Sequence, residues 1–123
     1  MNIQRIIAVA LLATILVLTA AVASADDDAK KIAKMNGKEL YKNFCKGCHT
    51  EESEAGEYTP MSLISEQWEE FFDETFVETH QEVVCPKDET KKVTDVFDKE
   101  MLKKLRKFCV DHAADSEQPM TCG

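Results

Sequence analysis

Basic residues are missing from a long stretch of this 123-residue chain: residues 47–86 contain eleven Asp or Glu and no Lys or Arg. From residue 26 onward the chain has twenty-three acidic and fourteen basic residues, and all the basic ones lie in 30–46 and 87–107. Proteins that bind nucleic acid need positive charge to neutralise phosphates. The composition therefore predicts that nucleic acid is not a partner.

Strand patterns, internal repeats and low-complexity segments are also lacking. Hydrophobic residues recur at helical spacing in three segments, and residues that favour a helix start stand at the beginning of each. These segments run from Asn36 to Cys48, from Ser65 to His80 and from Asp98 to His112. The segment 83–94 has Pro86 and little periodicity, which indicates a connecting loop. We therefore predict an all-α fold with about three main helices.

A second closely spaced cysteine pair is missing as well. The only pair separated by just two intervening residues is in Cys45-Lys46-Gly47-Cys48-His49, whereas the other cysteines are isolated: Cys85, Cys109 and Cys122. A zinc site needs a fourth ligand from a second such pair, and a thioredoxin-like pair follows a strand in a βαβ pattern. Neither context is present. The motif Cys-x-x-Cys-His is instead the attachment signature of c-type haem.

That chemistry requires these residues at this spacing. The two thiols add to the two vinyl groups of one porphyrin, and the adjacent imidazole then lies beneath the iron. We therefore predict one covalently attached haem c, bound by Cys45, Cys48 and His49, with His49 as an axial ligand.

The first residues have the pattern of a secretory signal peptide. A short positive start is followed by an apolar run from Ile6 to Val22 and by the small-residue sequence Ala23-Ser24-Ala25;. We expect residues 1–25 to be the signal peptide and residues 26–123 to be one domain in the periplasm. The alternative is an uncleaved segment that anchors the domain on the outer side of the inner membrane. Only in that case is a membrane association expected.

The three remaining cysteines are an odd number for an exported protein, so at most one intramolecular disulfide can form. A Cys109–Cys122 bond would join the tail to the last helix by a short loop and is the pairing we favour. A bond from Cys85 to either of the others stays open.

The pattern Gly37-x-x-Leu40-Tyr41-x-x-x-Cys45-x-x-Cys48-His49, with an amphipathic C-terminal helix over 98–112, resembles class I cytochrome c domains. The resemblance implies a cytochrome c-like fold in which the first and last helices cross beside the haem. The residues expected to meet there are Leu40, Tyr41 and Phe44 against Leu102, Leu105 and Phe108. It also implies an electron-transfer carrier that is not an enzyme and acts with redox partner proteins. The acidic charge favours partners with basic docking surfaces.

The second axial ligand does not follow from that family, which usually supplies a methionine from a loop before the last helix. No clear Met-Pro loop is present there. A second pattern, Tyr58-x-Pro60-x-x-Leu63-x-x-x-x-Trp68 followed by Thr79-His80, resembles the haem-binding units of small bis-histidine dihaem cytochromes. In those units the histidine at this place is the second ligand, which favours His80. Four alternatives stay open: Met120, Met61, His112 and an open site.

The sixth position also decides between two functions. A permanently bound second ligand suits an electron carrier. A labile ligand or an open position would suit a haem sensor or a catalytic haem protein, and this is the alternative hypothesis.

Overall fold

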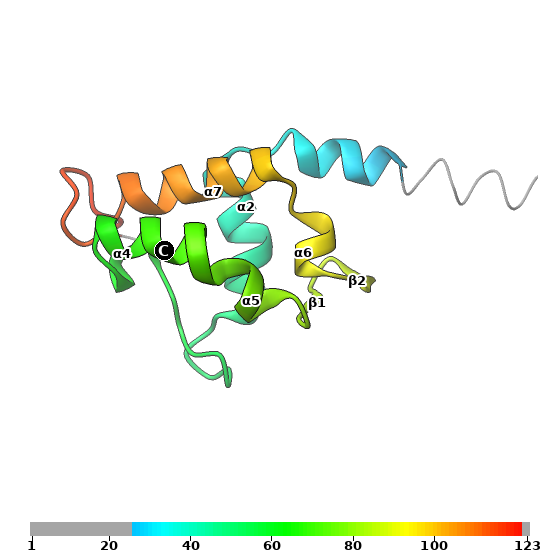
Figure 1. The fold of residues 1–123 in the computed structure, drawn as a ribbon, viewed down its shortest axis with the longest axis horizontal. Helices are drawn as coiled ribbons and strands as arrows, with labels where there is room; N and C mark the ends of the chain where they lie inside the picture. Colours follow the sequence, from blue (N-terminus) through cyan, green and yellow to red (C-terminus); the bar gives the residue numbers. More distant parts are fainter. Residues whose placement is uncertain (1–25, 122–123) are drawn as a thin grey trace, which may run out of the picture. The chain divides into compact units, whose positions relative to one another are not determined.

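The computed structural model describes residues 26–121, which divide into two compact units between Lys34 and Met35. In the first unit, residues 26–33 form a helix, drawn in blue in Figure 1. The expected signal peptide, residues 1–25, and Cys122 lie outside the described residues. No helix formed by residues 26–121 is long and apolar enough to cross a bilayer.

The first long helix of the second unit is continuous from residue 37 to residue 48. It consists of α2 (Gly37–Leu40), a π-helical turn (Tyr41–Cys45) and α3 (Lys46–Cys48). Asn36 caps it, because its Oδ1 accepts from the Glu39 amide at 3.0 Å and the Glu39 carboxylate accepts from the Asn36 amide at 2.8 Å. This reciprocal capping box satisfies amides that the first turn leaves free. The predicted helix start is confirmed.

The second long helix runs from residue 65 to residue 80, with the bounds that the sequence predicts. It consists of α4 (Ser65–Glu70), a second π-helical turn (Phe71–Thr75) and α5 (Phe76–His80). A short 3₁₀ turn, Pro60–Ser62, precedes it. Asp115 from the C-terminal tail caps its start, accepting from both the amide and the hydroxyl of Ser65 at 2.7 Å.

The segment 83–94 is not a simple loop, and that prediction was wrong. It contains an antiparallel hairpin of β1 (Val84–Cys85) and β2 (Asp88–Lys92), followed by α6 (Val93–Val96). Strand β2 is entirely polar and mostly exposed, so the apolar alternation that marks a half-buried strand is missing;. The fold is nonetheless predominantly helical, as predicted.

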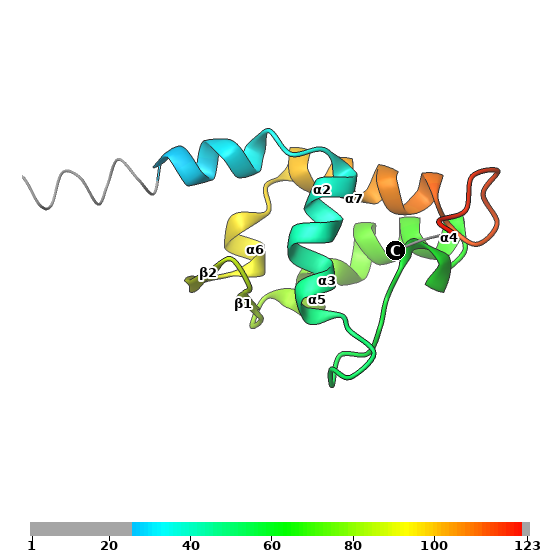
Figure 2. The ribbon, with the colours of Figure 1, turned by 180° about the vertical axis from the view of Figure 1, so that it is seen from behind.

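The last helix, α7 (Lys99–Asp111), connects the two long helices because it contacts both α2 and α4 (Figures 1 and 2). The Asp98 side chain caps it by accepting from the Met101 amide at 2.8 Å. At the crossing with α2 the helices approach so closely that a Cβ on Gly37 would lie 2.3 Å from the Lys104 carbonyl oxygen. The ring centres of Tyr41 and Phe108 are 5.6 Å apart there. The expected crossing of first and last helices is confirmed.

Candidate functional site

An apolar cavity of about 430 Å³ lies between the two long helices, α6 and α7. Its volume is typical of small-molecule and cofactor pockets, about 300–1,000 Å³. Aromatic side chains supply much of its wall: Tyr41, Phe44, Tyr58, Trp68, Phe71, Phe72, Phe76 and Phe97. Both π-helical turns contribute to this lining. Such turns are rare and frequently occur at functional sites.

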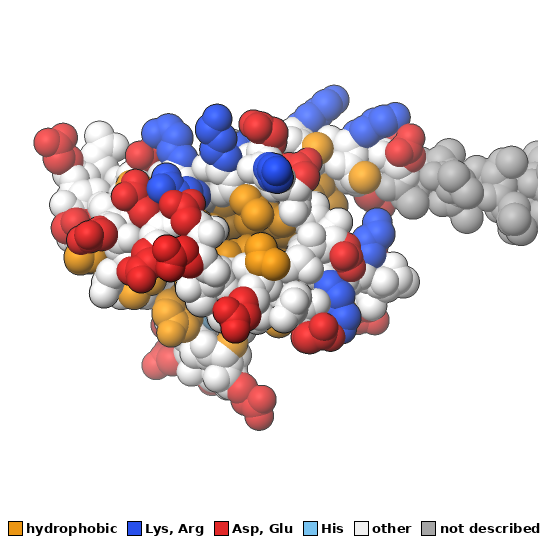
Figure 3. Space-filling model, viewed as in Figure 1, with side chains coloured by type: hydrophobic (Ala, Val, Ile, Leu, Met, Phe, Trp, Pro, Cys, Tyr) orange, Lys and Arg blue, Asp and Glu red, His pale blue; other side chains and the backbone are white. Residues whose placement is uncertain are grey.

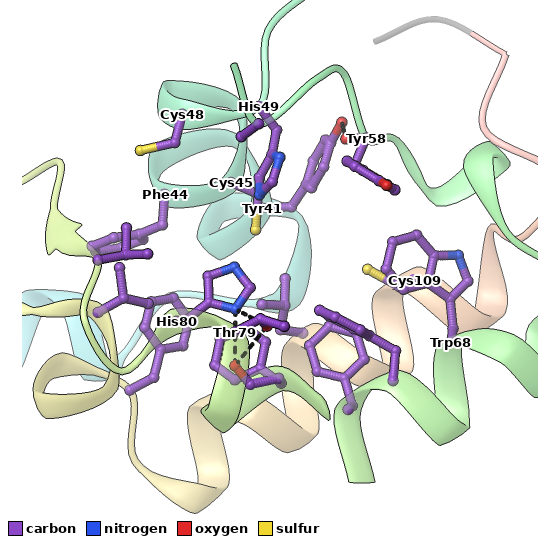
Figure 4. Close-up of a pocket in the computed structure, with 18 of the residues that line it drawn as sticks. Tyr41, Phe44, Cys45, Cys48, His49, Tyr58, Trp68, Thr79, His80 and Cys109 are labelled. Carbon is purple, nitrogen blue, oxygen red and sulfur yellow. Dashed lines mark hydrogen bonds between the residues drawn. The ribbon is translucent and has the colours of Figure 1, made fainter. Parts of the chain in front are cut away.

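The motif residues Cys45, Cys48 and His49 line the cavity from the end of the first helix. Spacings of three and four residues bring side chains to one face of a helix, and all three residues line the cavity. In Figure 4 the Cys45 sulfur and the His49 ring point toward His80, whereas the Cys48 sulfur is turned to the side. Both thiols are free. Burial, with a smaller effect of the neighbouring Cys48, raises the pKa of Cys45 to about 12, so its thiol is neutral at pH 7.

The His49 ring is held by the loop that follows it. Its Nδ1 lies 3.2 Å from the carbonyl oxygen of Gly56, and the Tyr58 ring packs edge-on against it with ring centres 5.3 Å apart. A carbonyl can only accept a hydrogen bond, so Nδ1 carries the proton. The Nε2 lone pair is therefore available to a metal, an arrangement common among metal-binding histidines.

His80 enters the cavity from the end of α5 (Figure 4). Its Nδ1 donates to the Phe76 carbonyl at 2.9 Å, which again leaves the Nε2 lone pair free;. Its ring stacks on the Phe76 ring, with centres 4.4 Å apart and planes inclined by 19°. Desolvation by burial is the largest effect on its pKa and lowers it, so the imidazole is neutral at pH 7, the form that binds metals;.

The two histidines face each other across the cavity, with ring centres 6.2 Å apart. A metal–imidazole bond is about 2 Å long, so two imidazoles on opposite sides of one metal have ring centres about 6 Å apart. The spacing thus leaves room for one metal ion between two nitrogen ligands. With two thiols beside one histidine and aromatic walls around both, these residues fit a covalently attached haem.

The other ligand candidates do not line this cavity. Met61 is 40% exposed at the 3₁₀ turn. His112 and Met120 lie together at a smaller pocket near the end of α7, where His112 Nδ1 donates to the Gln118 carbonyl at 2.7 Å. Of the candidates, the structure brings only His80 to His49.

Some residues of the site were not identified from the sequence. The Gly56 carbonyl and the Thr79 hydroxyl contact the two histidines, and Cys109 of α7 is buried at the cavity wall. Nothing in the sequence marked a glycine in a polar loop as the partner of a histidine, whereas Thr79 is next to His80 in the sequence.

Burial, and secondarily Cys45, raises the pKa of Cys109. Its predicted bond to Cys122 lies outside the described residues, and Cys85 is a free thiol buried at the hairpin.

Acidic side chains gather over α4, with basic side chains of α7 beside them (Figure 3). Part of this charge is paired, because Arg106 contacts Glu69 at 3.4 Å and Asp73 at 3.3 Å. Other acids form no ion pair within residues 26–121: Glu66, Glu70, Glu74 and Glu78 on the second long helix, and Glu51, Glu52, Glu54 and Glu57 in the loop after His49. The loop after His49 and the second long helix therefore carry negative charge that no ion pair compensates within the described residues.

Comparison with known proteins gave one family. The family model for Cytochrome c matches residues 34–107, a range that includes the Cys-x-x-Cys-His motif, His80 and most of α7. No curated protein and no solved structure matches the chain.

Proposed function

The chain belongs to the cytochrome c family, and on that ground we propose that it is an exported electron carrier with one haem c. Cys45 and Cys48 attach the haem, and His49 and His80 are its axial ligands. The observation that supports this ligand pair is the 6.2 Å separation of the two imidazole rings across an aromatic cavity. A haem bound here supplies one-electron iron chemistry.

The chain's own residues hold both ligands in place. Each histidine has its Nδ1 bonded to a backbone carbonyl, and the ring of His80 also rests on Phe76. Ligands fixed in this way stay bound in both oxidation states, which suits an electron carrier rather than an enzyme. Because two imidazoles give a lower potential than a histidine–methionine pair, the carrier belongs to the low-potential range.

Replacing His80 tests the ligand assignment. We expect His80→Ala holoprotein to lose the low-spin bis-imidazole absorption and electron paramagnetic resonance spectra. His112→Ala is the matched control, because that histidine is in the same domain but outside the cavity, and it should retain both spectra. A long-wavelength methionine–iron band in the unaltered ferric protein would contradict the assignment.

Carbon monoxide separates the carrier from a haem sensor or catalytic haem protein. With His80 firmly bound, reduced protein at neutral pH should show no rapid spectral change when the gas is added. A rapid change would indicate a displaceable ligand and would favour the sensor.

The partner is expected to present a basic surface. The unpaired glutamates after His49 and on the second long helix attract positive charge near the cavity;. Electron transfer with a basic redox protein should therefore slow as salt is added, because screening weakens the attraction. A rate independent of salt would argue against this surface.

Export and haem number are measured together by intact mass spectrometry of the protein purified from a host that exports and attaches haem. We expect a chain that begins at Asp26 and carries one haem. A chain that retains residues 1–25 would instead indicate the membrane-anchored form.

A further inference from the structure

Thr79 has its hydroxyl beside the His80 ring, at the rim of the cavity (Figure 4). Its Oγ1 lies 2.9 Å from His80 Nδ1, 3.0 Å from the Thr75 carbonyl oxygen and 3.2 Å from the Phe76 carbonyl oxygen. The two carbonyls can only accept, so the Thr79 hydroxyl proton is donated to one of them. A lone pair of Oγ1 is then left facing the Nδ1 proton of His80.

His80 Nδ1–H consequently has two acceptors, the Phe76 carbonyl and Thr79 Oγ1, each at 2.9 Å. Within residues 26–121, the Nδ1 proton of His49 is donated to the Gly56 carbonyl alone, at 3.2 Å. The two imidazoles of the pair are therefore held unequally, and the one from α5 has the shorter and more numerous contacts.

The same contacts fix the direction of the His80 ring. Stacking on Phe76 sets the plane of the His80 ring. The Phe71 ring packs edge-on against His80, with ring centres 6.1 Å apart. Stacking alone would allow a 180° flip of the ring about its Cβ–Cγ bond, which exchanges the positions of the nitrogen and carbon atoms. The two acceptors at Nδ1 remove that freedom and aim Nε2 across the cavity toward His49.

We propose that Thr79 is a positioning residue that orients His80 and tunes the reduction potential of the holoprotein, an inference that rests on the proposed ligand pair. Hydrogen bonds from the second nitrogen of a ligating histidine raise its basicity. A more basic imidazole stabilises ferric iron more than ferrous iron, which lowers the potential of the one-electron couple.

Thr79→Val tests this, because valine keeps the branched shape and removes the oxygen. Loss of outer-shell partners typically changes metal affinity by about 10- to 100-fold. A tenfold loss of preference for the ferric state raises a one-electron potential by about 59 mV. We expect Thr79→Val to raise the potential by that order and to change the ferric electron paramagnetic resonance spectrum. Thr79→Ser, which restores a hydroxyl, should return both toward the wild-type values.

Thr94→Val is the matched control. Thr94 is also a helical threonine, but it lies in α6 and does not line the cavity. Its variant should have the wild-type potential and spectrum, which separates the loss of this particular hydroxyl from the general effect of a Thr→Val change.

The outcomes test the His49–His80 ligand pair and the positioning role of Thr79 separately. If His80→Ala abolishes the bis-imidazole spectrum while Thr79→Val keeps the wild-type potential and spectrum, His80 is the ligand and the role of Thr79 is refuted. If His80→Ala leaves the spectrum unchanged, the proposed ligand pair is wrong and the role of Thr79 falls with it. If Thr79→Val itself loses the bis-imidazole spectrum while Thr79→Ser retains it, the positioning role is supported.

Discussion

The crossing of α2 and α7 leaves no space for a side chain at position 37, and Gly37→Ala is the smallest change that tests this. A Cβ at that position would lie 2.3 Å from the Lys104 carbonyl oxygen and 2.6 Å from the Phe108 Cβ. Neither obstacle can rotate away, because one belongs to the backbone of α7 and the other is fixed to it. The substitution must therefore push the two helices apart.

The size of the effect follows from these distances. Nonbonded carbon atoms normally rest about 3.5–4.0 Å apart, so relieving the 2.6 Å contact with Phe108 needs a shift of about 1 Å;. Overpacking of this kind costs about 1–3 kcal/mol. We expect a cost near the upper end of that range, because the Lys104 carbonyl oxygen and the Phe108 Cβ cannot move without the backbone of α7. Alanine recovers part of the cost, up to about 1 kcal/mol, through its higher helix propensity. We expect a net loss of about 2–3 kcal/mol in the free energy of unfolding.

Denaturant and thermal unfolding of the holoprotein measure this loss. For a domain of this size, each kcal/mol lost from the free energy of unfolding lowers Tm by roughly 4–8 °C. The Tm of Gly37→Ala should therefore fall by roughly 10–20 °C. Gly47→Ala is the control in the same continuous helix. Its Cβ would meet only Pro86, at an ordinary 3.4 Å, so its stability should be unchanged or slightly raised;. Equal midpoints for the Gly37→Ala protein and the wild type would refute the close crossing.

Two further predictions concern the loop after His49 and the C-terminal tail. Gly56 has φ of +72°, so Gly56→Ala should cost about 1–2 kcal/mol of stability in denaturant unfolding; an unchanged midpoint would argue against this backbone conformation. The pKa of Asp115 lies below its ordinary value of 3.8 because it accepts from the Ser65 hydroxyl and amide. Its contribution to stability is therefore present above pH 3.8 and lost as pH falls through the lowered value;. Asp115→Asn should be less stable than wild type near neutral pH and should lose less stability on acidification, and parallel pH profiles would contradict the capping role.

Local patterns predicted the helices because short-range interactions decide where a helix begins. Asn36 and Glu39 form a capping box within four residues, and Asp98 caps α7 through the Met101 amide;. Such contacts depend on neighbours in sequence and little on the rest of the fold. The hairpin was missed because polar, exposed strand β2 carries no alternating apolar pattern;.

The two π-helical turns were not predicted either. Residues 41–45 and 71–75 have ordinary helical composition, and both turns lie where the two long helices line the cavity. A π turn inserts one residue per turn relative to an α-helix and shifts the side chains that follow. Their position at the cavity agrees with the frequent occurrence of π turns at functional sites.

The sequence by itself determined the family chemistry of this protein, because Cys45, Cys48 and His49 are adjacent and any helix brings them to one face. It could not determine which distant residue faces His49, since His80, Met61, Met120 and His112 were all compatible with the pattern. Only the tertiary structure decided that His80 lies across the cavity. Its position depends on the second long helix packing against α7, with the ring then fixed by Phe76 and Thr79.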